Sequence, residues 1–189
     1  MAKVGLSGAY VAPHAENKIG TFASLGSMIK YDGSPKWSER ELYGNNTLVQ
    51  SKSVFTKSDI TFEVDDVSVS TLQTVFACTV NQETNEITFN DNDKTVYMTA
   101  GIIGKIEMTD GATKYRAIIL PKITLTPPSD AYQTEGESTT YQTATLSGKW
   151  YKADNGDWKK EKICDTLDAA IAYIKTFEGA DTATLAQAT

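Results

Sequence analysis

Apolar and polar residues alternate along two neighbouring segments in the middle of the chain. From Val96 to Met108 every second residue is apolar or glycine, and residues 114–126 keep the same two-residue period. Because successive side chains of a β-strand point to opposite faces, this period predicts a strand in each segment. Asp110-Gly111 lies between them, and both residues tolerate the positive φ angles of a tight turn. The two segments are therefore predicted to form a β-hairpin.

The second of these strands carries apolar residues on both of its faces. Ile118 and Leu120 lie on one face, and the other is predicted to hold Tyr115, Ala117, Ile119, Ile123 and Leu125. The middle of this strand is therefore expected to be buried on both sides. Pro121 has no N–H to donate to a neighbouring strand, so it indicates a bulge or a sheet edge at this point.

A third alternating segment, residues 56–65, leads into a short helical pattern. Ile60, Phe62 and Val64 point one way in the predicted strand, and the polar residues between them point the other way. Residues 68–77 then place Leu72, Val75 and Phe76 on one narrow stripe, which predicts a short central helix. Ser70 and Gln73 have the spacing of a capping box at its start.

The last third of the chain predicts a turn and a second helix. Trp150 and Trp158 flank Asn155-Gly156, a dipeptide typical of a tight hairpin turn. Residues 165–177 repeat apolar positions with helical spacing, and Asp165 or Thr166 can cap the helix N-terminus. Residues 180–189 are small and polar, and they are expected to form a flexible C-terminal tail.

Residues 32–52 form a long segment with large apolar residues, and it is predicted to be an extended loop or hairpin. Exposed aromatic anchors favour interfaces, so we expect this segment to contact another subunit. The alternative is a loop that folds back on its own domain. The candidate interface residues are Trp37, Leu42, Tyr43, Leu48 and Val49. Without an internal repeat or a linker, residues 1–179 are interpreted as one domain.

The charge balance restricts the possible partners. Eighteen Lys and Arg against 24 Asp and Glu give the 189-residue chain a formal charge of −6. A module that reads nucleic-acid sequence needs a basic face to neutralise phosphates, so this class is not expected. No apolar run approaches the roughly 20 residues of a membrane-spanning helix, so no membrane contact is expected either.

No motif for catalysis or for a cofactor is found. His14 is the single histidine, in a segment that looks flexible, and Cys78 and Cys164 are too far apart in sequence for a C-x-x-C motif. Both cysteines are expected to be buried thiols. Glu135 and Glu137 could be imagined as a hydrolytic pair, but adjacent acids in a polar loop are usually solvated. The sequence therefore predicts a protein without enzymatic activity, metal or cofactor.

Several segments together resemble a known family. They are the run 120–130 with Pro127-Pro128, then 134–137, then 141–148, the opening residues 5–12, and the pair Trp150 and Trp158 followed by a closing helix. This succession resembles the major tail (tail tube) proteins of long-tailed bacteriophages (siphophages) that infect Gram-positive bacteria. The resemblance implies a mainly β fold, a β-sandwich or rolled β-barrel of the tail-tube type, with a flanking C-terminal helix.

The same resemblance implies a structural function in the virion tail, for a protein made in the cytoplasm of the bacterial host. Six subunits would form a homohexameric ring, and stacked rings would form the tube that conducts DNA during ejection. A tape-measure protein would set the tube length, with tail terminator and distal tail proteins as further partners. Segment 32–52 would then reach an adjacent subunit or ring.

An acidic channel wall would repel DNA phosphates, so DNA could pass without sequence-specific binding. Some of five acidic residues are predicted to line this lumen: Asp59, Glu63, Asp65, Glu135 and Glu137.

A second hypothesis belongs to another functional class. The chain could be a monomeric β-sandwich module that binds a carbohydrate or a cell surface. Trp37, Trp150 and Trp158 would then form the aromatic platform on which a sugar ring stacks.

Overall fold

A computed structural model describes residues 1–15, 18–44, 47–81, 83–84, 86–91, 95–128 and 143–177. For residues 15, 42–44 and 47–49 it describes the backbone alone. The predicted tail 180–189 and the acidic candidates Glu135 and Glu137 lie outside the described residues.

Strands dominate the chain, with one short central helix and one C-terminal helix, as the sequence predicts. In chain order the elements are β1 (Ala2–Ala15), β2 (Lys18–Ile19), β3 (Ala23–Ser24), β4 (Met28–Ser34), β5 (Trp37–Gly44), β6 (Thr47–Phe55), β7 (Ser58–Val64), α1 (Val69–Phe76), β8 (Thr79–Asn81), β9 (Glu86–Thr88), β10 (Met98–Glu107), β11 (Thr113–Leu125), β12 (Ala144–Tyr151), β13 (Lys160–Cys164) and α2 (Leu167–Lys175).

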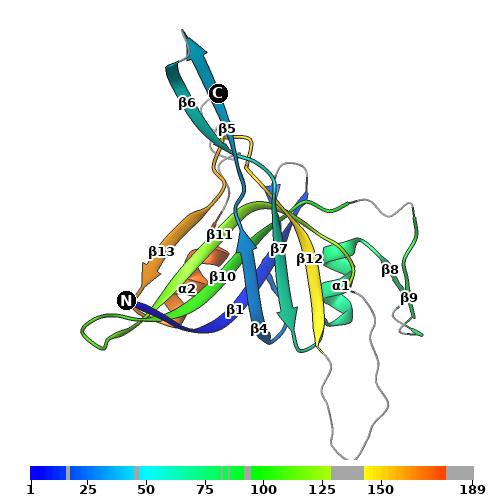
Figure 1. Ribbon diagram of the computed structural model, residues 1–189. Helices are drawn as coiled ribbons and strands as arrows, with labels where there is room; N and C mark the ends of the chain where they lie inside the picture. The colour runs from blue at the N-terminus through cyan, green and yellow to red at the C-terminus, as the bar shows by residue number, and fades with distance from the viewer. Residues whose placement is uncertain are drawn as a thin grey trace, which may run out of the picture.

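The main sheet is antiparallel and curls back on itself. Its strands follow the order β2-β1-β10-β11-β12-β7-β4, with β3 paired to β1 and β13 paired to β11. Strands β1 and β4 are far apart in this order but lie in contact, so the sheet is rolled (Figure 1). The hairpins β5–β6 and β8–β9 are separate two-stranded sheets that extend from this body (Figure 1).

The inside of the rolled sheet holds the larger apolar core. The alternation predicted for β7 is confirmed, because Ile60, Phe62 and Val64 are buried there while the residues between them are half-buried. Helix α1 adds Val75 and Phe76 to the same core. Its N-cap is Ser68, whose Oγ accepts a hydrogen bond from the Thr71 amide, so the predicted capping box at Ser70 is wrong.

A smaller core lies on the outside of the sheet, under helix α2. Ile174 of α2 packs over β10 at Gly101, where a Cβ atom would lie only 2.3 Å from the Ile174 Cγ2 atom. The absence of a side chain at position 101 therefore lets the helix approach the sheet. Thr166 caps this helix by accepting a hydrogen bond from the Ala169 amide at 3.2 Å, which is one of the two predicted caps.

Strand β11 contains the bulge that Pro121 indicates. Met98 pairs with Ile123 and Ala100 with Leu120, so two residues of β11 lie opposite the single Thr99. The Thr99 hydroxyl donates a hydrogen bond to the Pro121 carbonyl oxygen at 2.9 Å.

The extra residue reverses which face each later side chain occupies. Ala117 and Ile119 lie in the outer core as predicted, but Ile123 and Leu125 join the inner core with Leu120. The prediction that all five alternating residues share one face is therefore wrong.

The turn at Asn155-Gly156 is present, but the expected hairpin is not. Gly156 has a φ of +90°, and the Ala153 amide donates to the Asp157 carbonyl at 2.7 Å. Strand β12 pairs with the second half of β11 and with β7, whereas β13 pairs with the first half of β11. The two strands separate at the turn because each follows a different part of β11.

Among the described residues, neither helix is long and apolar enough to span a bilayer.

Candidate functional site

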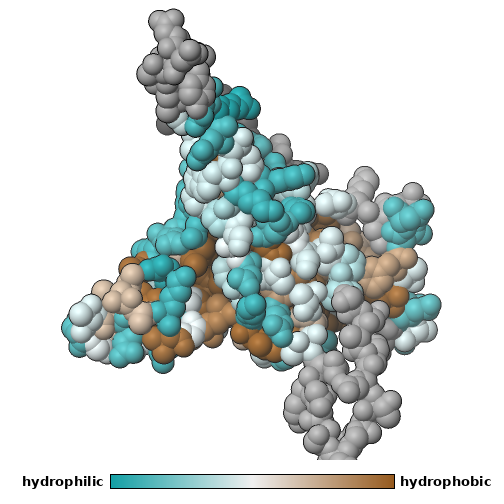
Figure 2. All heavy atoms as spheres, viewed as in Figure 1, coloured by the Kyte–Doolittle hydropathy of each residue, from teal (hydrophilic) through white to brown (hydrophobic). Residues whose placement is uncertain are grey.

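The β5–β6 hairpin is the most conspicuous feature outside the rolled body, and it contains most of the predicted segment 32–52. Its strands pair from Trp37 with Phe55 at the base to Gly44 with Thr47 at the far end, and it projects away from the body (Figure 1). Residues 38–41 and 50–53 are all exposed. The described part of the hairpin is hydrophilic to neutral, whereas apolar surface gathers on the body (Figure 2). A two-stranded hairpin without an apolar face is marginally stable in water, so something must support it.

The first support is an aromatic cluster at the hairpin base, which we call the base cluster: Trp37, Phe55, Trp150 and Trp158. The Phe55 ring stacks on Trp158 with centroids 5.0 Å apart and tilts against Trp150 at 5.3 Å. Trp37 meets Phe55 and Trp158 edge-on at 5.9 and 5.4 Å. Phe55 is 7% exposed, so the end of β6 is fixed to the body by a desolvated ring.

Burial in this cluster argues against the three-tryptophan platform. Trp150 is 1% exposed, and its Nε1–H group donates to the Trp158 carbonyl oxygen at 2.6 Å. A sugar stacks on an accessible ring face, and Trp150 has none. Trp37 is 50% exposed, so half of its surface already belongs to contacts within its own chain. The base of the hairpin therefore packs against its own domain, as the alternative for residues 32–52 expects. The strands beyond the base do not, because residues 38–41 and 50–53 are exposed.

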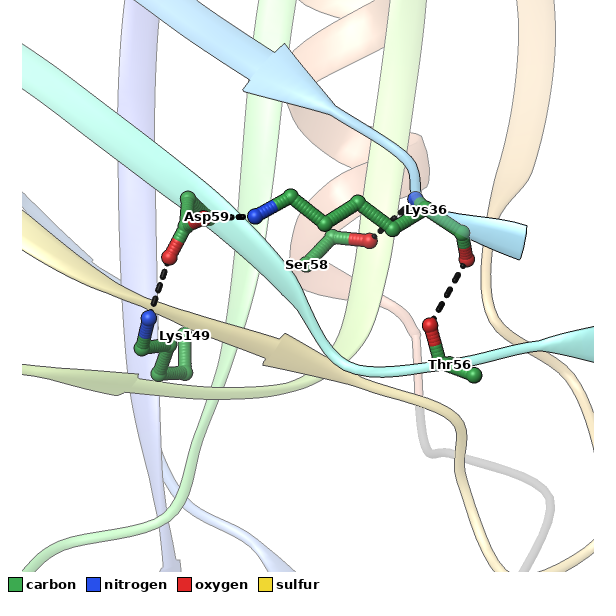
Figure 3. Close-up of polar contacts among 5 residues, drawn as sticks. All are labelled: Lys36, Thr56, Ser58, Asp59 and Lys149. Atoms are coloured by element: carbon green, nitrogen blue, oxygen red, sulfur yellow. Dashed lines mark hydrogen bonds and ion pairs between the residues drawn. The ribbon is translucent and has the colours of Figure 1, made fainter. Parts of the chain in front are cut away.

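The second support is polar and is drawn in Figure 3. Asp59 on β7 pairs with the Nζ atoms of Lys36, at 2.5 Å, and of Lys149 on β12. The Lys36 amide donates to Ser58 Oγ at 2.7 Å, and Thr56 donates to the Lys36 carbonyl oxygen through both its amide and its hydroxyl. Lys36 and Thr56 flank the two hairpin strands. Both ends of the hairpin are therefore tied to each other and to the main sheet.

These contacts perturb the titration of Asp59. Hydrogen bonds from Lys149 and Lys36 lower the pKa of this carboxyl to about 2. Asp59 is therefore ionised throughout the physiological pH range, and its charge is opposed by two adjacent cations.

The two faces of the hairpin carry opposite charges. Residues paired across antiparallel strands share a face, so Glu39 and Glu41 lie on the same face as Trp37 and Phe55, with Ser51 and Ser53 opposite them. The other face carries Arg40 directly opposite Lys52. Within the described residues neither of these two cations has an ion-pair partner. Like charges at directly opposite positions destabilise a strand pair, so Arg40 and Lys52 would gain from an acidic neighbour.

The remaining predicted interface residues, Leu42, Tyr43, Leu48 and Val49, lie on the strands toward the far end of the hairpin. Their side chains are outside what the structure describes. Phe55 was not predicted as an anchor, because residues 50–53 are all polar and no local pattern marks the ring as buried.

The structure brings only part of the predicted lumen set together. Asp59 and Glu63 lie four residues apart on the outer face of β7. Glu63 accepts a hydrogen bond from the Thr143 hydroxyl at 2.9 Å. Asp65 lies beyond the strand, where its Oδ1 accepts from the Ser27 and Asp66 amides, both at 2.8 Å. Hydrogen bonds from Ser27 and Asp66 lower the pKa of Asp65. With Lys36 and Lys149 bound to Asp59, this face is mixed in charge rather than acidic.

No metal-binding group is found in the part of the chain that the structure describes. That part contains no group of three His, Cys, Asp or Glu residues able to hold a metal ion. His14, expected in a flexible segment, lies instead in the long strand β1, with Nε2 2.9 Å from the Thr99 hydroxyl. Cys78 and Cys164 are both buried, as predicted.

Comparison of the chain with models of known protein families finds no match, and a search of curated proteins finds no significant match.

Proposed function

We propose that this protein is a structural subunit that assembles with copies of itself into hexameric rings stacked as the tail tube of a bacteriophage. The observation that carries the proposal is the β5–β6 hairpin, which is anchored firmly at its base and has no apolar cover along its exposed strands. Because an isolated two-stranded hairpin is only marginally stable in water, contact with a neighbouring subunit would stabilise its exposed strands. Its role would be the contact between subunits or rings.

Open strand edges support the same proposal. Among the described strands, none pairs with the outer edge of β13, and the outer edge of β1 is paired only at Tyr10 and Val11, by β3, and at His14 and Ala15, by β2. Exposed apolar residues lie along these two strands, including Val4 and Ile163, which is 45% exposed. Edges of this kind invite pairing with another chain, which a ring of subunits would use productively.

The proposal includes no catalytic activity and no cofactor. The partners would be further copies of the chain, a tape-measure protein, and the tail terminator and distal tail proteins. The tube would conduct DNA past acidic residues drawn from the predicted lumen set. Asp59, with its two lysine partners, is the least suitable member of that set, since its charge is already balanced.

The test is assembly with and without the hairpin. Wild-type protein at increasing concentration should show rings or tubes by negative-stain microscopy and large species by sedimentation velocity. A variant in which residues 39–52 are replaced by a two-residue turn keeps the base cluster and should remain a folded monomer. A wild-type protein that stays monomeric at all concentrations, also when mixed with preformed tube fragments, would refute the proposal.

A further inference from the structure

A hollow beside the hairpin base carries lysines without ion-pair partners among the described residues, like Arg40 and Lys52 on the hairpin. It encloses about 330 Å³ and is lined by Phe55, Lys57, Tyr97, Lys122, Tyr151 and Lys152, with Thr56. We call it the lysine pocket. It is formed where the chain enters β7, where β11 crosses, and where β12 ends, so it lies next to the base cluster.

The pocket is cationic, with aromatic walls. Tyr97 is 47% exposed and meets Tyr151 edge-on at 6.2 Å, and the Lys122 Nζ atom lies 5.0 Å from the centre of the Tyr97 ring. Asp154 pairs with Lys122 at 3.2 Å. Lys57 and Lys152 are exposed, and neither has an ion pair within the described residues. Three lysines against one carboxylate leave an excess of positive charge in a protein whose net charge is −6.

The acidic face of the hairpin has the complementary chemistry. Glu39 and Glu41 are exposed and lie two residues apart on one strand, so their carboxylates point the same way about 6–7 Å apart. Two carboxylates with this spacing could form ion pairs with Lys57 and Lys152 in the pocket. The pocket and the hairpin are different surfaces of the same chain, as a head-to-tail contact requires.

We infer that the lysine pocket is the receptor for the acidic face, Glu39 and Glu41, of the hairpin of a neighbouring copy of this chain. The inference rests on the proposed self-assembly and adds to it which surfaces meet. Each hairpin would lie against the base of the next hairpin, so one contact repeated would close a ring or extend a filament. The Tyr97 and Tyr151 rings would exclude water from the carboxylate–lysine contacts and strengthen them.

Charge reversal tests this pairing, because the signs of the charges on the pocket and on the hairpin can be reversed separately. The pocket variant carries Lys57→Glu and Lys152→Glu, and the hairpin variant carries Glu39→Lys and Glu41→Lys. Each variant alone places like charges at the contact, and we expect its critical concentration for assembly to rise at least tenfold. In an equimolar mixture every hairpin can find a pocket of opposite charge, so the mixture should assemble near the wild-type concentration. This rescue also shows that both variants are folded.

A matched control makes the same change in net charge elsewhere. Lys105→Glu with Lys175→Glu alters exposed positions of β10 and α2 that belong neither to the hairpin nor to the open edges of β1 and β13, and it should leave assembly within twofold of wild type. Equal loss of assembly in this control, or failure of the mixture to assemble, would overturn the inference. Normal assembly of the pocket variant would also overturn the inference, but the proposed function would stand. A wild-type protein that never assembles would overturn both the inference and the proposed function. If the pocket variant assembles normally but no longer binds a single-stranded oligonucleotide that wild type binds, the pocket serves phosphate groups instead.

Discussion

Replacement of Phe55 by alanine tests whether the base cluster holds the hairpin to the body. The Phe55 side chain is 7% exposed and contacts three tryptophan rings with centroids 5.0 to 5.9 Å away. Deletion of a buried phenylalanine ring costs about 3–5 kcal/mol, because apolar burial is lost and a cavity remains. This is a large part of the roughly 5–15 kcal/mol that stabilises a typical domain. At about 2–4 °C per kcal/mol for a chain of this size, the melting temperature should fall by about 6–20 °C.

The assay combines calorimetry with hydrogen exchange. The Phe55→Ala protein should melt at the lower temperature, and the amides of β5 and β6 should lose protection far more than those of β10 and β11. Phe89→Ala provides the control, because Phe89 is 50% exposed and its loss should cost less than about 1 kcal/mol. If Phe55→Ala destabilises the protein no more than Phe89→Ala, or if the hairpin amides stay protected, the base cluster does not anchor the hairpin.

Three further predictions concern the body and the polar contacts at the hairpin base. Gly101→Ala should lower the free energy of unfolding in urea by about 1–3 kcal/mol, because its Cβ atom would collide with Ile174. The double variant with Ile174→Ala should lose less stability than the sum of the two single variants. Asp59 has a pKa lowered to about 2, so its contribution is complete above its ordinary pKa near 4 and is lost as the pH falls toward 2. The protection factors of amides at the hairpin base, which correct for the pH dependence of intrinsic exchange, should therefore fall between pH 4 and 2 in wild type, and an equal fall in Asp59→Asn would contradict this assignment. Thr166→Ala should cost about 1 kcal/mol in urea denaturation by removing the cap of α2, and no change would show that the helix start is held by packing alone.

The arrangement at the hairpin base separates two tasks between two kinds of interaction. The aromatic rings supply burial, which is large but does not fix direction. The Lys36, Asp59 and Lys149 contacts lie on exposed surface, where ion pairs add little stability but hold defined geometry. Together they hold the base of a polar hairpin against the body, as the proposed contact with a neighbouring subunit would require.

Local patterns in the sequence were enough to predict β7, α1, β10, β11 and α2, whereas the long strand β1 was not predicted. The two-residue period of β7, β10 and β11 and the Asp110-Gly111 turn follow from side-chain alternation, and the α2 cap at Thr166 follows from hydrogen-bonding chemistry within one turn. These features depend on residues close in sequence, so the sequence contains them without reference to the fold. The mainly β class, the central helix and the C-terminal helix could be predicted for the same reason.

The tertiary structure decided where those elements meet. A bulge at Pro121 sends Ile123 and Leu125 to the opposite face, and alternation alone cannot show such a shift because it counts residues and not partners. Strands β12 and β13 separate because each pairs with a different half of β11. The base cluster joins residues more than 100 positions apart, and the lysine pocket collects cations from three separate segments of the chain. Such contacts depend on the packing of the whole chain, so no local pattern in the sequence encodes them.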